Sequence, residues 1–186
     1  MPNWCYTSYV IEGDKEDLEK IEIIYKNMIA DESIEGYTNR RWVGHLVKAF
    51  GEDPKDYSCR GWIEDLFFEG ENLEMYISSA WVELSEVHQL IEEKLPSVKI
   101  YFYAEEGGCG HYVTNDSAGA YFPGRYSVDV FDEGQEYYDT EDEVFAVLSD
   151  LLNVEIDSIE KAESEVEKYN ESHEEEYISF NVIKVV

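Results

Sequence analysis

The sequence of 186 residues predicts an α+β fold in which an antiparallel sheet carries helices on one face. Three observations support this prediction. Short segments alternate apolar and polar residues, which is typical of strands with one buried face. Longer segments repeat apolar residues at helical spacing, and turns rich in glycine separate the two kinds of segment. With 44% hydrophobic and 15% aromatic residues, the chain has enough apolar side chains for a core.

The first predicted unit is a strand over residues 5–12 followed by a helix over residues 15–30. Trp4 and Cys5 open the alternating segment, so their side chains point to opposite faces of the strand and cannot share one chemical site. We expect Trp4 or Cys5 to be buried by packing. The apolar residues of the helix fall on one stripe: Leu18, Ile21, Ile24, Tyr25 and Met28.

A hairpin and a second helix follow along the chain. Strands are predicted over residues 59–69 and 73–82, with Gly70 in the turn between them. A helix is predicted over residues 86–95, because apolar residues recur there at helical spacing. Residues 98–105 alternate again and predict a fourth strand.

This order, β-α-β-β-α-β, is that of the ferredoxin-like split β-α-β arrangement, an antiparallel sheet covered by two helices on one face. The predicted core spans residues 1–106. A segment near residues 39–51 interrupts it, and there Trp42, Leu46 and Phe50 share a helical face. We therefore expect one short inserted helix.

Residues 107–186 predict an acidic α/β extension packed on the core. Its glycines indicate a loop or hairpin, "RYSVDVF" alternates as a strand, and Thr140 with Glu143 forms a capping box before a helix. The acidic segment from Glu155 to Glu176 is expected to be partly helical. A last strand, "YISFNVIKVV", is expected to dock on the same structure, because an exposed apolar strand invites aggregation.

Two stretches, "MPNWC" and "LPSVKIYFYAEEGGCGHY", resemble a known family. The sequence is similar to the YubB-like ferredoxin-fold family of plasmid- and phage-encoded proteins, whose members open with an Asn-Trp-Cys strand and later carry a Y-x-E-x-G segment. The resemblance implies a fold and a mobile-element setting, but no established activity and no catalytic residues. The matching positions are Asn3, Trp4, Cys5, Tyr103, Glu105 and Gly107.

The charge excludes several classes of function. The chain has 43 Asp and Glu against 14 Lys and Arg, and its net charge of -29 repels phosphate backbones and anionic headgroups. We therefore expect no direct binding to nucleic acid and none to membranes. No apolar run approaches the roughly 20 residues that span a bilayer, and the three cysteines are too widely spaced for a disulfide framework. These features predict a cytoplasmic protein with free thiols.

Cys109 and His111 are the only thiol and imidazole close together in the sequence, and both residue types bind metals. No second pair lies at the spacing of a metal site, so we expect neither a metal nor a cofactor. Glu105 and Glu106 would raise the pKa of the Cys109 thiol and make it a poor nucleophile. The sequence therefore predicts no catalytic residue.

The acidic helix indicates a non-catalytic interaction protein. Between Glu155 and Glu176 there are ten acidic residues and two lysines, and like charges at helical spacing repel each other unless a basic partner relieves the repulsion. We predict that this ridge binds a basic protein partner, with mimicry of nucleic acid as one form of that binding. The residues expected to contact the partner are Glu163, Glu167, Glu171, Glu175, Tyr101, Tyr103 and Glu105.

The alternative is an enzyme or small-molecule binder. It would use a pocket between the core and the glycine-rich segment 105–124, with Glu105, Cys109 and His111 at the mouth. The sequence leaves the oligomeric state open.

Overall fold

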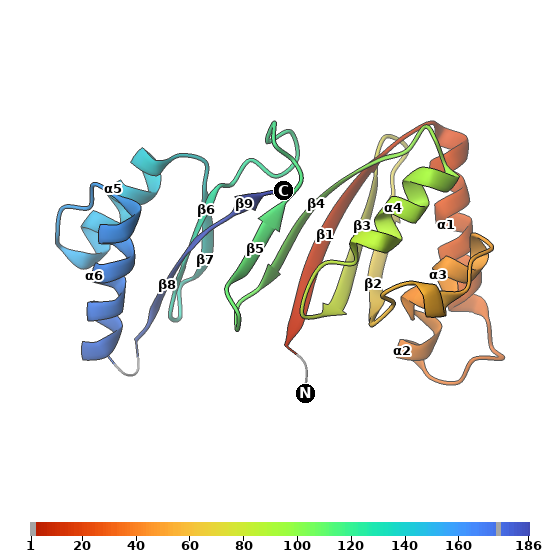
Figure 1. Cartoon of the computed structure of the whole chain (residues 1–186), viewed down its shortest axis with the longest axis horizontal. Coiled ribbons are helices and arrows are strands. Elements are labelled where there is room, and N and C mark those ends of the chain that lie inside the picture. The colour runs from red at the N-terminus through yellow and green to blue at the C-terminus, as the bar shows by residue number, and fades with distance from the viewer. Residues whose placement is uncertain (1–2, 174–175) are drawn as a thin grey trace. The chain divides into compact units, whose positions relative to one another are not determined.

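The structure is a computed structural model that describes residues 3–173 and 176–186 (Figure 1). The chain divides into two compact units, Met1–His111 and Tyr112–Val186. In the described residues, helices combine with mainly antiparallel strands, which confirms the predicted α+β class. None of the described helices has the length and apolar character needed to cross a membrane.

The first unit contains the predicted strands and helices. Its strands pair side by side in the order β2-β3-β1-β4, with every pairing antiparallel. In chain order its elements are β1 (Trp4–Glu12), α1 (Lys15–Ala30), α2 (Tyr37–Arg40), α3 (Val43–Ala49), the 3-10 turn η1 (Pro54–Asp56), β2 (Gly61–Phe68), β3 (Leu73–Ala80), α4 (Ser85–Lys94) and β4 (Lys99–Glu106).

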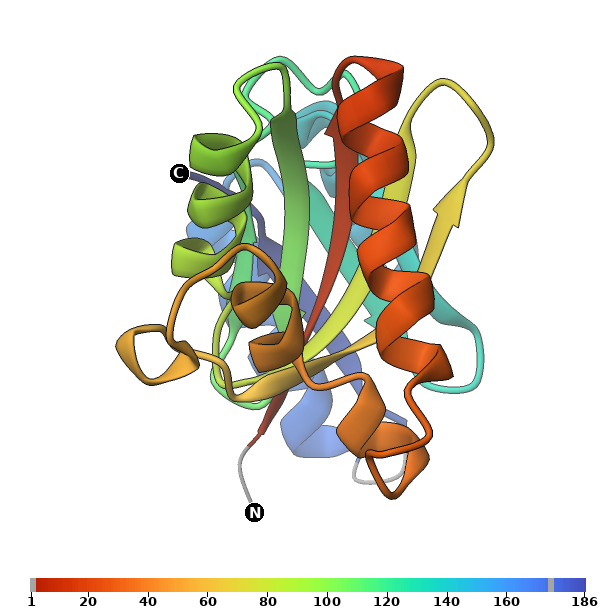
Figure 2. The ribbon, with the colours of Figure 1, turned by 90° about the vertical axis from the view of Figure 1, so that its right-hand side faces the viewer.

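The helices of the first unit cover one face of its sheet, as Figure 2 shows for α1 and α4. Tyr9 and Ile11 of β1 point into this interface together with Cys5, which is fully buried. Burying an aliphatic side chain such as that of Ile11 stabilises the folded chain by about 1.5–3 kcal/mol. Trp4 lies on the opposite face and packs against Trp62, with ring centroids 4.4 Å apart. The expectation that packing buries Trp4 or Cys5 is confirmed for Cys5.

The inserted segment differs from the prediction, because it forms two short helices, α2 and α3, instead of one. The break falls at Trp42, whose backbone forms an isolated bridge with Trp62 and whose indole Nε1 donates to the carbonyl oxygen of Cys59 at 2.7 Å. These long-range contacts hold the Trp42 backbone in a non-helical conformation, with ψ of 126°. A helical stripe in the sequence does not reveal such contacts.

The second unit has a small sheet of its own, in which β6 lies between β7 and β8 and pairs antiparallel with both. A parallel pair, β5 with β9, completes its strands, and β5 begins at the unit boundary. The elements are β5 (His111–Thr114), β6 (Tyr126–Val130), β7 (Gly134–Tyr138), α5 (Glu141–Leu152), α6 (Ile159–Ser172), β8 (Ile178–Val182) and β9 (Lys184–Val185).

The core of the second unit lies between α5, α6 and the small sheet. Val144 and Leu148 of α5 pack with Val166 of α6 and with Val128 of β6. The predicted capping box at the start of α5 is confirmed, because the Thr140 side chain accepts from the backbone N–H of Glu143 and the Glu143 side chain accepts from the backbone N–H of Thr140.

Two features of the second unit were not predicted. The strand β7 has no clear apolar alternation, and it forms because a turn at Asp132 and Gly134, both with positive φ, folds it back onto β6. The expected last strand is divided at the buried Ile183, whose N–H donates to the Arg125 carbonyl oxygen at 2.8 Å. The chain then continues as β9 beside β5.

Candidate functional site

Three of the predicted partner-binding residues line one side of α6. Glu163, Glu167 and Glu171 are spaced four residues apart, so their side chains follow each other along the helix. All three are exposed. Ala162 and Val166 of the same helix are buried in the core, which fixes the rotation of α6 and keeps the glutamates at the surface. Glu175, the fourth predicted residue of the ridge, lies outside the described residues.

A groove runs between this row of glutamates and the strand β8. It has a volume of about 710 Å³, with the carboxylates on one wall and aromatic side chains on the other. Tyr177 is about half exposed there, and Phe180 stacks on Tyr126 with ring centroids 6.3 Å apart. The lining residues are Glu163, Val166, Glu167, Asn170, Glu171, Tyr177, Ile178, Ser179 and Phe180.

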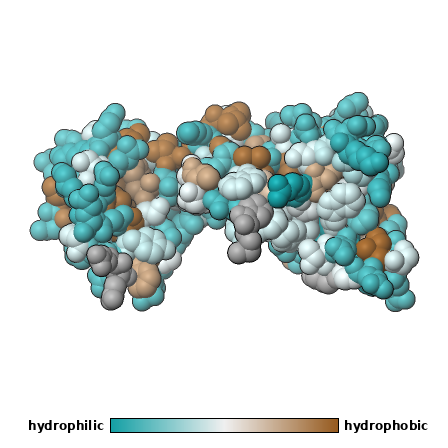
Figure 3. All heavy atoms as spheres, turned by 60° about the horizontal axis from the view of Figure 1, so that its bottom comes forward, coloured by the Kyte–Doolittle hydropathy of each residue, from teal (hydrophilic) through white to brown (hydrophobic). Residues whose placement is uncertain are grey.

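Among the described residues of this unit, no cation neutralises the charge of the groove. The two lysines of α6 are engaged elsewhere, Lys161 with Asp157 at 3.5 Å and Lys168 with Glu165. Across residues 3–173 and 176–186, no Lys, Arg or His forms an ion pair with Glu163, Glu167 or Glu171. Most residues on the face drawn in Figure 3 are hydrophilic, with apolar residues set between them.

The outer edge of β8 offers backbone groups to the groove. Among the described strands of its sheet, β8 pairs only with β6. The Asn170 side chain donates to the Ile178 carbonyl oxygen at 2.7 Å and accepts from the Ile178 N–H at 2.8 Å, so these groups point away from β6. Because this direction alternates along an antiparallel strand, the N–H and C=O of Phe180 point to the same edge.

The two tyrosines predicted to contact the partner, Tyr101 and Tyr103, lie in the first unit. Tyr101 and Tyr103 are half-buried on β4, on the face opposite to the buried Ile100 and Phe102. The Tyr103 hydroxyl donates to Glu105 at 2.8 Å, and the Lys99 ammonium group lies 4.5 Å from the centre of the Tyr101 ring. The two predicted groups of partner-binding residues therefore belong to different units.

The Cys109 region is organised by Glu106. This carboxylate accepts from the backbone N–H groups of Gly108 at 2.7 Å and Cys109 at 2.8 Å. Burial by itself would raise the pKa of Glu106, but these hydrogen bonds outweigh it and hold the pKa below its usual value. The hydrogen bond to Glu106 in turn raises the pKa of the exposed Cys109 thiol, in the expected direction. A thiol that stays protonated is a poor nucleophile.

His111 has a buried Nε2 atom for which the described residues provide no hydrogen-bond partner. The described residues also contain no group of three or more His, Cys, Asp or Glu side chains placed to hold a metal ion. The pocket predicted between the core and segment 105–124, with Glu105, Cys109 and His111 at its mouth, stays a prediction.

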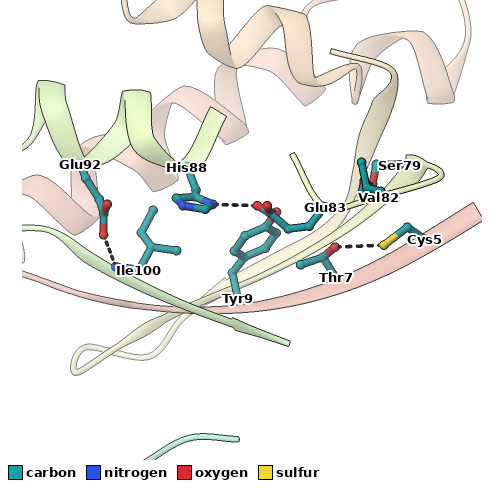
Figure 4. Close-up of polar contacts among 9 residues, drawn as sticks. All are labelled: Cys5, Thr7, Tyr9, Ser79, Val82, Glu83, His88, Glu92 and Ile100. Atoms are coloured by element: carbon teal, nitrogen blue, oxygen red, sulfur yellow. Dashed lines mark hydrogen bonds and ion pairs between the residues drawn. The ribbon is translucent and has the colours of Figure 1, made fainter. Parts of the chain in front are cut away.

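A buried polar cluster in the first unit was not predicted as a site (Figure 4). Glu83 accepts from the Tyr9 hydroxyl at 2.8 Å and contacts Nδ1 of His88 at 2.7 Å, through the same carboxylate oxygen. All three residues are buried. Burial is the main reason that the pKa of Tyr9 lies well above its usual value. The only signal in the sequence was His88, which interrupts the apolar stripe of α4.

No protein-family model matches the sequence, and a comparison with curated proteins found no significant match.

Proposed function

We propose that this chain is a non-catalytic, acidic interaction protein that binds a basic segment of a protein partner in the groove between α6 and β8. The observation that carries the proposal is the row of Glu163, Glu167 and Glu171, three exposed carboxylates without an ion-pair partner in the described residues, along an aromatic wall. Arg and Lys side chains pair with carboxylates and also stack on aromatic rings, so both walls favour the same ligand.

An extended segment fits this groove better than a folded surface. The backbone groups of Phe180 point toward the outer edge of β8, where a further strand can add by main-chain hydrogen bonds. Asn170 already supplies such bonds to Ile178 at one end. A bound strand would present alternate side chains to the glutamates, so we propose a partner segment with basic residues at every second position.

The wider setting is also a proposal. The strand order β2-β3-β1-β4 supports a ferredoxin-like first unit, because it is the order of the split β-α-β arrangement. Together with the opening "MPNWC", this order supports membership of the YubB-like family and a mobile-element origin. We place the protein in the cytoplasm, where its acidic surface would capture a nucleic-acid-binding protein by mimicking nucleic acid.

The proposal is tested with the triple variant Glu163→Gln, Glu167→Gln and Glu171→Gln. Binding of a synthetic peptide of alternating arginine and valine is expected to weaken about tenfold at low salt, because each exposed ion pair contributes about 0.2–1 kcal/mol. Isothermal titration calorimetry at two salt concentrations measures this change, and higher salt should weaken wild-type binding as well.

A matched variant in the same unit controls for the loss of net charge. This control removes three exposed carboxylates outside the groove, by the substitutions Glu133→Gln, Asp142→Asn and Asp150→Asn. This control is expected to bind the peptide almost as wild type does. Equal weakening in both variants would mean that only the overall charge attracts the peptide, and unchanged binding in the first variant would remove the groove from the proposal.

Salt is expected to stabilise the free protein. With a net charge of -29, repulsion within the folded chain is screened as ionic strength rises from low to physiological values, so the melting temperature should rise. In the triple glutamine variant the rise should be smaller, because three mutually repelling charges are gone. Thermal unfolding followed by circular dichroism measures both curves, and a melting temperature that does not rise with salt contradicts the expectation.

A further inference from the structure

A second pocket, in the first unit, differs in character from the acidic groove. It has a volume of about 550 Å³ and lies where β1 and β2 meet the inserted segment. Three of the four tryptophans of the chain line it. Its lining residues are Trp4, Thr38, Asn39, Trp42, Pro54, Lys55, Tyr57, Cys59, Arg60, Gly61 and Trp62.

The aromatic walls of this pocket are held in place by specific contacts. The Trp42 indole donates to the Cys59 carbonyl oxygen at 2.7 Å, and its ring lies so close to Gly44 that a Cβ atom there would come within 2.3 Å of it. Trp62 packs against Trp4 and donates through Nε1 to Glu64 at 2.5 Å. The ring faces are therefore positioned before any ligand arrives.

The described residues that line this pocket include two cations and no carboxylate. Lys55 and Arg60 are exposed at its rim, and none of the described residues that line it is Asp or Glu. Neither cation forms an ion pair with any described residue. Carboxylates lie just outside the lining, since Asp53 accepts from the backbone N–H of Lys55 at 3.0 Å and Glu64 accepts from the Trp62 indole at 2.5 Å. Lys55 and Arg60 therefore supply the positive charge at the rim itself.

We propose that this pocket binds a small planar aromatic anion of mononucleotide size, with the ring stacked on the tryptophans and the anionic group held by Lys55 and Arg60. Aromatic rings stack on indole faces with little dependence on their substituents, and Arg and Lys form charge-assisted hydrogen bonds with phosphate. The site lies in the other unit from the α6–β8 groove, so this inference is independent of the proposed function.

Adenosine monophosphate is the probe, and the readout is the intrinsic fluorescence of the tryptophans, excited beyond the absorption of adenine. A saturable quench is expected with the nucleotide. Adenosine, which lacks the phosphate, and ribose 5-phosphate, which lacks the ring, are each expected to bind at least tenfold more weakly. No saturable change with the nucleotide overturns the proposal, and so does equal binding of adenosine.

The variant Lys55→Ala with Arg60→Ala is expected to weaken nucleotide binding about tenfold or more, because two charge-assisted contacts are lost. Lys15→Ala with Lys20→Ala removes the same charge from exposed positions of α1 and is expected to leave binding unchanged. Circular dichroism verifies that both variants are folded. If both pairs weaken binding equally, or if the first pair has no effect, Lys55 and Arg60 do not hold the anion and the proposal is wrong.

Discussion

Replacing Glu83 by alanine is expected to lower the free energy of unfolding by about 3–5 kcal/mol, because it leaves two enclosed partners of a buried carboxylate without an acceptor. The Tyr9 hydroxyl and Nδ1 of His88 both contact one oxygen of Glu83, at 2.8 Å and 2.7 Å. Neither partner can turn to solvent, since Tyr9 is 2% and His88 9% exposed. Urea denaturation followed by circular dichroism measures the loss.

Two further variants separate the buried cluster from a general effect of charge. Glu83→Gln keeps an oxygen acceptor and is expected to lose only about 1–3 kcal/mol. Glu93→Ala removes an exposed carboxylate from α4 and is expected to stay within about 0.5 kcal/mol of wild type. If the free energy of unfolding of Glu83→Ala also lies within about 0.5 kcal/mol of the wild-type value, the cluster contributes nothing to stability.

The segments that the sequence predicts well are those with a single dominant period. The strands β1 and β4 alternate buried residues with more accessible ones along their whole length, and β3 does so over its first half. The bounds of all three fall within two residues of the prediction. β3 ends at Ala80, before the predicted position 82, because Trp81 adopts a φ of 77°, which a strand does not tolerate. Periodicity gives the element, whereas contacts with distant residues decide where it stops.

The polar cluster and the tryptophan pocket could not be predicted for the same physical reason. Glu83 and Tyr9 are 74 residues apart, and the three tryptophans of the pocket come from β1, the inserted segment and β2. Only the pairing of the strands brings them together. In the acidic groove, by contrast, the spacing of Glu163, Glu167 and Glu171 already places them on one side of a helix. The wall formed by β8 could not be foreseen from that spacing.

Alkaline pH is expected to destabilise the protein through Cys5, beginning near pH 9. Burial raises the pKa of this thiol from 9.0 to about 11 in the folded chain. Between these two values the unfolded chain has released a proton that the folded chain retains, so rising pH favours unfolding. A pKa shift of this size contributes about 2–3 kcal/mol to the free energy of unfolding. The full contribution is present below pH 9, and it is lost as the pH rises to about 11. Tyr9, with its raised pKa, adds to the loss above pH 10.

The variant Cys5→Ala tests the assignment through the slope of stability against pH. It is expected to be less stable than wild type at neutral pH, because a small cavity replaces the sulfur, yet its free energy of unfolding should fall less steeply between pH 9 and 11. Cys109→Ser, an exposed thiol, should change the slope much less, because solvent screens its interaction with Glu106. Urea denaturation at a series of pH values, with a reductant present, gives the three slopes. A slope in Cys5→Ala as steep as that of wild type would mean that other groups, with Tyr9 the first to consider, control the alkaline transition.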